Sequence, residues 1–258
     1  MREFLEDAHA HREDGYGRAQ AHARPVLPKR FYANAAAASA PGGFVVELDG
    51  KPTRTPAMRP VVVPAAPLAE AMAAEWAAQG EFIDPGTMPL VRLVNAAIES
   101  GEDRVVALRE EIVRYAGSDL LLYRADTPQE LIAEQERLWD DALVRIARHF
   151  GVGFQPTIGI VHQSQPEATL ARLGQGLEGE GLLVLTALAS VTNLTGSGLL
   201  ALALRFRLLG PDAVWQAAHV DEDFNARIWG QDEEAAVRRQ RRRREFDAAV
   251  QVLEVLLA

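Results

Sequence analysis

The first sixty or so residues carry the hydrophobic pattern of short β-strands. Three of the four residues at 45–48 are apolar, and the dipeptide at 49–50, Asp-Gly, is a strong signal for a two-residue hairpin. Pro52 would place the returning strand at an edge, because proline cannot donate to a β-ladder. The apolar run 61–63 predicts a third short strand. We therefore expect a small β-rich N-terminal domain over residues 1–66.

From residue 67 onward the hydrophobic period becomes that of a helix. Leu68, Met72 and Trp76 recur every four residues, which is typical of an amphipathic helix. Similar patterns predict further helices at 89–97, 105–115, 128–150, 166–174, 182–193, 198–209, 211–219, 221–229 and from 232 onward. The last helix carries a packed apolar face only in its second half. The sequence thus predicts an α+β protein, with a larger all-α helical bundle domain over residues 67–258.

One predicted strand, at 156–161, stands alone among helices. Its backbone groups need hydrogen-bond partners. The other predicted strands all lie in the N-terminal part, so we expect 156–161 to join that sheet and the two domains to be interleaved. Residues 1 to about 28 are polar and are expected to form a frayed arm or an irregular helix.

The segment 181–204 carries no charge and is long enough to cross a bilayer. Polar and glycine residues at 192–198 interrupt it, which is typical of a turn between two buried helices. We expect a core hairpin and no membrane insertion.

Composition narrows the class of protein further. The chain has 258 residues, 48% of them hydrophobic, so it can bury a sizeable core. Its net charge of −9 argues against general nucleic-acid binding, which needs a basic field. The absence of cysteine excludes disulfides and zinc–thiolate sites. The N-terminus lacks the apolar run of a signal peptide, so we expect a cytoplasmic protein.

Motifs of common enzyme classes are absent. The chain has no phosphate-binding loop, no dinucleotide-binding glycine pattern after a strand and no nucleophile elbow. His149, His162 and His219 are scattered, and each is more readily explained as structural. The acids at 140–141 and 221–223 could hold a divalent cation, but adjacent acids on a helix point in different directions, which favours a solvated face. We expect no catalytic residue, metal or cofactor.

A densely charged stretch runs from residue 221 to 244. It contains six acids and then six arginines: Asp221, Glu222, Asp223, Asp232, Glu233, Glu234, Arg238, Arg239 and Arg241 to Arg244. Gly230 suits the end of one helix and Asp232 the N-cap of the next, where Glu233 and Glu234 would meet the positive end of the helix dipole. The arginine-rich first half of the last helix should be solvated or should meet a partner.

Several separate pieces of the sequence together resemble one family. They are 29–32 (KRFY), 48–56 (LDGKPTRTP), 73–80 (AAEWAAQG), 88–99 (MPLVRLVNAAIE), 119–126 (DLLLYRAD) and 224–235 (FNARIWGQDEEA). In this order and spacing they resemble the ATP12-type assembly chaperones of F-type ATP synthase. The resemblance implies a bacterial, non-enzymatic protein that binds the free α subunit and prevents its aggregation until it assembles with β. It also implies a small β-containing domain followed by a helical bundle.

Two motifs of this family supply candidate partner-binding residues. The E-W-x-x-Q element corresponds to Glu75, Trp76 and Gln79. The family usually has an acidic residue after the tryptophan, but this chain has Ala77 at that position. Trp76 also continues the apolar stripe of its helix, so core packing is the alternative. The last motif corresponds to Trp229, Asp232, Glu233 and Glu234. Trp229 suits either core or interface, and the three acids suit either helix capping or partner contact.

Two other functions stay open. A carboxylate- or metal-dependent enzyme could use the acids at 221–234, and would show a metal requirement or a cleft with strongly raised carboxyl pKa values. The arginine-rich segment 238–244 could bind RNA or an acidic protein, with a steep dependence on salt. We expect a monomer.

Overall fold

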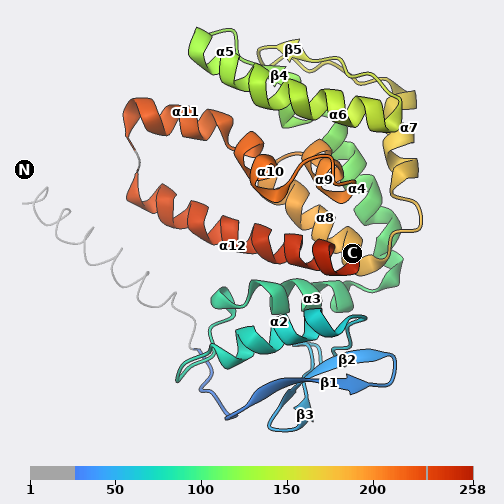
Figure 1. The fold of residues 1–258 in the computed structure, drawn as a ribbon, viewed down its shortest axis with the longest axis vertical. Helices are drawn as coiled ribbons and strands as arrows, with labels where there is room; N and C mark the ends of the chain where they lie inside the picture. The colour runs from blue at the N-terminus through green and yellow to red at the C-terminus, as the bar shows by residue number, and fades with distance from the viewer. Residues whose placement is uncertain (1–26, 231, 258) are drawn as a thin grey trace, which may run out of the picture.

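The computed structural model describes residues 27–230 and 232–257 and has two layers of different composition (Figure 1). A three-stranded antiparallel sheet lies at one end, and a bundle of helices forms the rest. The fold class predicted from the sequence is therefore confirmed. The expected N-terminal arm, residues 1 to about 28, lies outside the described residues apart from its last two positions.

The sheet has the order β1-β2-β3, formed by β1 (Ala35–Ala40), β2 (Gly43–Leu48) and β3 (Lys51–Pro52). Leu48 pairs with Lys51 across a two-residue turn. Asp49 and Gly50 have φ values of 49° and 77°, the positive values that a type I′ hairpin requires. The hairpin and the edge position of the strand that contains Pro52 are both confirmed.

Two features of the sheet differ from expectation. The sequence pattern did not predict β1, because five of its six residues are alanine, which has a low β propensity. It nevertheless pairs with β2 along its whole length, from Ala35 opposite Leu48 to Ala40 opposite Gly43. The prediction of a strand at 61–63 was wrong, since this segment pairs with its neighbours only through an isolated bridge from Val63 to Phe44 of β2 and a hydrogen bond from the Val61 amide to the carbonyl of Thr53 (3.4 Å).

The strand expected at 156–161 exists in a shortened form but has another partner. β5 (Thr157–Ile158) pairs in parallel with β4 (Tyr123–Arg124), and these two form a separate sheet. Docking on the N-terminal sheet was therefore wrong. The true partner follows a short 3₁₀ turn, η3 (Leu120–Leu122), in an apolar run too short to be assigned from sequence.

The helices occupy nearly all of the predicted positions. They are α2 (Ala66–Ala77), α3 (Pro89–Ser100), α4 (Val105–Gly117), α5 (Gln129–Gln135), α6 (Asp141–Phe150), α7 (Glu167–Gly176), α8 (Leu182–Thr195), α9 (Gly198–Arg205), α10 (Pro211–Ala218), α11 (Val220–Trp229) and α12 (Glu233–Leu256). Short 3₁₀ turns lie at Pro85–Thr87 and Glu102–Arg104, and a π-helical turn at Glu136–Asp140 joins α5 to α6. Gly151, with φ of 67°, ends α6 in the left-handed conformation.

The uncharged segment forms the buried hairpin of α8 and α9, as expected. Leu188, Val191 and Leu200 have no exposed surface, and the two helices contact each other directly. At the turn, Asp119 is fully buried and accepts hydrogen bonds from the Ser197 hydroxyl (2.6 Å) and the Leu199 amide (2.9 Å). Within residues 27–230 and 232–257, no helix has the length and apolar character needed to span a membrane.

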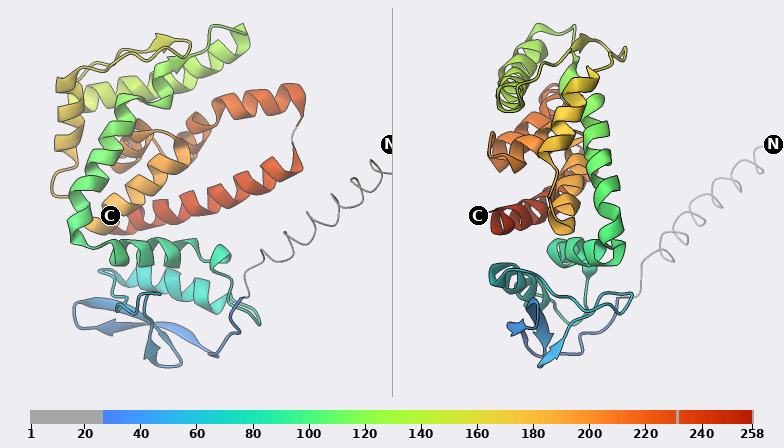
Figure 2. Two further views of the ribbon diagram at one scale, coloured as in Figure 1. Left: turned by 180° about the vertical axis from the view of Figure 1, so that it is seen from behind. Right: turned by 90° about the vertical axis from the view of Figure 1, so that its right-hand side faces the viewer.

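The last helix connects the two layers (Figure 2). α12 packs against α8 in the bundle and against α3 and α2 beside the sheet. Phe246, Ala249 and Leu253 in its second half are buried, as the sequence predicted. The division at residues 66 and 67 stays a prediction; α2 itself packs on β1 and β2, so the first helix lies with the sheet.

Candidate functional site

Glu75 of the E-W-x-x-Q element caps the next helix. Its carboxylate accepts the amide of Leu90 (2.9 Å) and the amide of Val91 (2.8 Å), both in the first turn of α3. Burial raises the pKa of Glu75, while these two amides and Arg92 act in the opposite direction. The carboxylate therefore holds α2 to the positive end of α3.

Gln79, the last residue of the same element, is also engaged within the protein. It is buried, and its side-chain amide donates to the carbonyl of Glu75 (3.0 Å) and the hydroxyl of Thr87 (3.0 Å). Its side-chain oxygen accepts the amide of Asp84 (2.8 Å). Glu75 and Gln79 together fix the turn that connects α2 to α3.

Trp76 lies between the core and a surface groove. It is partly buried, its carbonyl accepts the Tyr32 hydroxyl (2.7 Å), and the two rings pack edge to face at 5.7 Å. Its indole nitrogen is buried without a hydrogen-bond partner among the described residues. The groove beside it, about 400 Å³, is also lined by Lys51 and by Phe31, which is 74% exposed. Packing on the core thus accounts for only part of this side chain.

The second group of candidates lies at the turn between α11 and α12, far from the E-W-x-x-Q element (Figure 1). Trp229 is 84% exposed, which excludes core packing for this residue. Ile228 and Val237 are also exposed, at 57% and 59%. The turn therefore presents large apolar side chains to solvent.

The acids around this turn divide into two sets. Asp232 caps α12 by accepting the amide of Ala235 (3.0 Å), so the predicted N-cap is confirmed. Glu233 and Glu234 are exposed in the first turn of α12. By contrast, Asp221 accepts the side-chain amide of Gln135 (2.8 Å) within the fold. Glu233 and Glu234 of α12 are thus presented to solvent beside the apolar group, as is Glu222 of α11, which lines the same pocket as Trp229.

A metal-dependent site finds no support in this region. In the described part of the chain, no group of three or more His, Asp or Glu side chains could hold a metal ion. Among the described residues, the carboxyl groups whose pKa is raised are Glu75 and Asp119, and neither belongs to residues 221–234. Asp119 is enclosed in the core, where burial raises its pKa to about 7.

His219 lies between α10 and α11, as the residue that precedes the first turn of α11, and is a structural residue. Its ring is buried and its Nδ1 lies 2.7 Å from the carbonyl of Trp215. Burial lowers the pKa of His219, which favours the neutral ring. Because a carbonyl oxygen can only accept, the proton of the neutral ring is on Nδ1 and is donated to Trp215. The sequence-based interpretation of this histidine as structural agrees with its surroundings.

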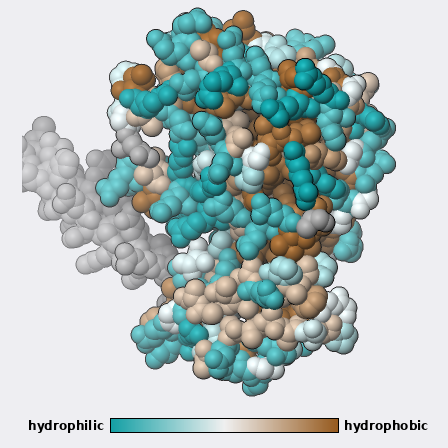
Figure 3. Space-filling model, in the orientation of Figure 1, coloured by the Kyte–Doolittle hydropathy of each residue, from teal (hydrophilic) through white to brown (hydrophobic). Residues whose placement is uncertain are grey.

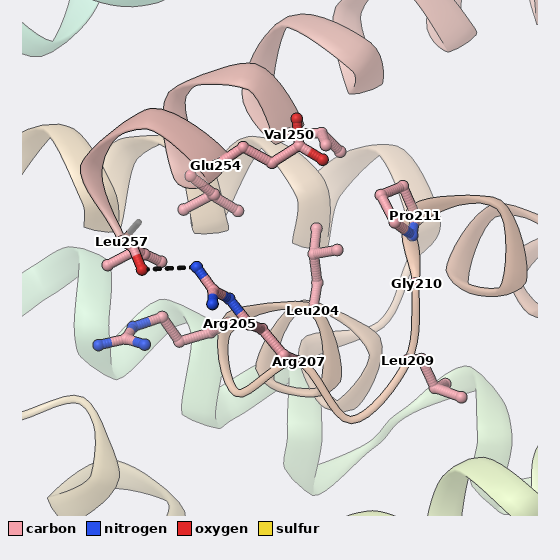
Figure 4. A pocket seen from close by; sticks show the side chains of 10 residues that line it. Leu204, Arg205, Arg207, Leu209, Gly210, Pro211, Val250, Glu254 and Leu257 are labelled. Carbon is pink, nitrogen blue, oxygen red and sulfur yellow. Dashed lines mark hydrogen bonds between the residues drawn. The ribbon is translucent and has the colours of Figure 1, made fainter.

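A pocket of about 360 Å³ lies beside the end of α12, where no candidate residue was predicted (Figure 4). Leu204, Val250 and Leu257 provide apolar walls. Arg207, which has a positive φ of 54°, donates to the carbonyl of Leu257 (2.7 Å) and closes one side. Figure 3 shows hydrophobic surface gathered in this part of the molecule, between α10 and the end of α12. Sequence periodicity could not reveal it, because the same leucines and valines also fill the core.

Comparison with known proteins places this architecture among chaperones. The profile of the ATP12 chaperone protein family matches residues 29–147. A solved structure from Agrobacterium tumefaciens, described as a suspected chaperone, is 42% identical over 93% of this chain and 90% of its own, with a TM-score of 0.85. Atp12 from Paracoccus denitrificans is 33% identical over 88% of this chain and 98% of its own, with a TM-score of 0.80. Both likenesses are much longer than the profile match, which ends in α6.

Proposed function

Because the chain belongs to the ATP12 chaperone family, we propose that it binds the free α subunit of the ATP synthase catalytic sector and prevents its aggregation before assembly with β. A role as a chaperone in ATP synthase assembly follows from the family itself. The identity of the client as the α subunit is the further step.

The observation that carries this proposal is the turn between α11 and α12. Trp229, Ile228 and Val237 expose large apolar side chains, and Glu233 and Glu234 lie beside them. Exposed aromatic residues with a charged rim are typical of the energetic centre of protein–protein interfaces. We propose that Trp229, Asp232, Glu233 and Glu234 contact the client there.

The physical requirement of the client fits such a surface. A subunit without its neighbours exposes the apolar area that its oligomeric interface will later bury, and such area drives aggregation. A chaperone for it needs a complementary surface that releases the client later. No catalytic group is needed, and we propose that the protein acts without catalysis, as a monomer, in the cytoplasm.

The E-W-x-x-Q residues have a different role in this account. The polar groups of Glu75 and Gln79 form hydrogen bonds with α3 and with the turn before it. We propose that they support client binding indirectly by fixing the α2–α3 pair on which α12 rests. Trp76 borders the groove beside Phe31 and would add a contact only at that edge.

Co-expression with the host's α subunit, without β, tests the proposal. Wild type should keep α soluble and co-purify with it, whereas the double variant Glu233→Ala/Glu234→Ala should retain much less. The matched control is Glu102→Ala/Asp103→Ala, which removes two exposed adjacent acids from another helical N-terminus. Circular dichroism checks the fold of each variant.

Two results would count against the proposal in different ways. If wild type never retains α, the client is not the free α subunit. If wild type retains α and both double variants retain it equally, the client stands but the acids of α12 are not part of the contact.

A further inference from the structure

The six arginines of α12 divide into two sets of three with different surroundings. Arg239 pairs with Asp223, Arg242 donates to the carbonyl of Leu194, and Arg243 bonds Asp212 and Asp247. These three hold α12 in the bundle. The other three are exposed and make no ion pair among the described residues: Arg238, Arg241 and Arg244. The fold therefore accounts for one set and leaves the other set available.

Two of the exposed arginines, Arg238 and Arg241, continue a face that is already an interface farther along the helix, and Arg244, three residues after Arg241, lies at its edge. Residues spaced three and four apart share one side of a helix, and the row 234, 238, 241, 245, 248, 252 follows this spacing. In its second half, Glu245 bonds Arg92 of α3 (3.2 Å), and Val252 has no exposed surface. Among the helices of the described residues, none lies beside the first half of α12 on the side where α3 meets its second half (Figure 1).

The first half of this face borders a shallow hollow, in which charged and apolar side chains follow one another in a fixed order along the helix. It measures about 560 Å³ and is lined by Glu233, Glu234, Val237, Arg238 and Arg241. Glu233 and Glu234 lie in the first turn of α12, the exposed Val237 comes next, and the guanidinium groups of Arg238 and Arg241 follow. A partner that fits it must be apolar in the middle and acidic over the arginines.

We propose that the first half of α12 docks an acidic, amphipathic helical segment of the client protein along this face. The segment takes the place that α3 occupies on the second half, with its carboxylates on Arg238, Arg241 and Arg244 and its apolar side chains on Val237. This inference rests on the proposed function, because it gives the chemistry of the client segment. It also explains why a protein of net charge −9 exposes three neighbouring arginines that make no ion pair within residues 27–230 and 232–257.

A peptide titration tests the chemistry without the α subunit. The probe is a synthetic 18-residue helix-forming peptide with leucine on one face and glutamate beside it, titrated by calorimetry at low salt. Arg238→Gln/Arg241→Gln/Arg244→Gln should weaken its binding about tenfold, because each exposed ion pair contributes modestly. The loss should shrink in 0.5 M NaCl, where screening acts within a few ångströms.

A matched variant separates local contact from net charge. Arg104→Gln/Arg137→Gln/Arg148→Gln removes three exposed arginines that make no ion pair within the described residues, and it should bind the peptide like wild type. The same peptide with lysine for glutamate should not bind. A single-stranded RNA oligonucleotide and phosphatidylserine vesicles should show no dependence on the arginines of α12.

The outcomes distinguish this inference from the proposed function. Equal affinity of wild type and the Arg238/Arg241/Arg244 variant for the acidic peptide overturns the inference, as does arginine-dependent binding of RNA or vesicles in place of the peptide. In the co-expression assay, loss of α from this variant alone supports the inference. Retention of α by wild type and by this variant alike overturns the inference while the proposed function stands. If wild type fails to retain α, the proposed function fails, and the peptide titration still decides the chemistry of the surface.

Discussion

Replacing Glu75 tests whether the E-W-x-x-Q element stabilises the fold or contacts the client. The first amides of a helix have no partners within it. In α3, Pro89 has no amide hydrogen, and the amide of Arg92 already bonds the carbonyl of Met88 (3.0 Å). The two amides in between, of Leu90 and Val91, are those that Glu75 accepts. Glu75→Ala would leave both without a partner.

The magnitude follows from these two hydrogen bonds. A bond to a charged group is worth about 1.5–3 kcal/mol, and a buried amide left unpaired costs about 1–3 kcal/mol. Removing the partly buried carboxylate offsets part of this loss of stability, because burial disfavours the charged form of Glu75 and raises its pKa. We expect a net loss of about 3 kcal/mol for Glu75→Ala. For a domain of this size each kcal/mol lowers Tm by about 2–4 °C, which gives roughly 8 °C.

The assay is thermal unfolding followed by circular dichroism, with two reference variants. Glu75→Gln keeps one acceptor oxygen and should lose about half as much stability. Glu70→Ala removes an exposed acid from the same helix and should leave Tm within about 1 °C. Below its Tm, Glu75→Ala should still retain the α subunit. A Tm unchanged by Glu75→Ala, together with loss of the client, would refute the structural role and restore direct contact.

Further substitutions test other parts of the account. Trp229→Ala should change the unfolding free energy by less than about 0.5 kcal/mol, since the side chain is 84% exposed, but weaken α-subunit binding by about 2 kcal/mol or more in a titration. Asp232→Ala should cost about 1 kcal/mol of stability in urea unfolding, because α12 loses its cap. Gly198→Ala should destabilise by about 3 kcal/mol, because its Cβ would lie 2.3 Å from a backbone oxygen of α4, whereas Gly174→Ala has room and should be neutral or stabilising. The folded pKa of Asp119 is raised to about 7 from 3.8, so its contribution to stability is full below the lower value and is lost as the pH rises through the higher one. Between about pH 5 and 7, the unfolding free energy of wild type should therefore fall by roughly 1.4 kcal/mol per pH unit relative to that of Asp119→Asn. If urea unfolding gives a stability difference between the two proteins that does not change with pH, the raised pKa of Asp119 is contradicted.

The helical part of the fold could be predicted because its information is local. The spacing of Leu68 and Met72 predicts α2. Pro89, Gly151 and Asp232 indicate helix ends through their own backbone and side-chain chemistry. The sheet was harder to predict. The alanines of β1 form a strand only because β2 lies beside them, and β4 and β5 are two residues each, too short to carry a period.

The candidate site shows the same division. The position of α12 relative to α8 and α11 decides whether Trp229 is exposed and which of the six arginines make contacts within the fold. The spacing of residues along the chain does not reveal this position. The capping role of Glu75 was missed for a related reason. Its partners, Leu90 and Val91, lie 15 and 16 residues away, so the motif alone could not separate a stabilising acid from a binding one.

The most direct measurement of the central claim is the aggregation of purified α subunit, followed by light scattering after dilution from denaturant. With an equimolar amount of this protein present, scattering should stay low, and later addition of β should release α into a complex without renewed aggregation. The Glu233→Ala/Glu234→Ala variant should protect less, and the Glu102→Ala/Asp103→Ala variant should protect like wild type. Scattering of α that is unchanged by wild-type protein at equimolar and higher ratios would contradict the account.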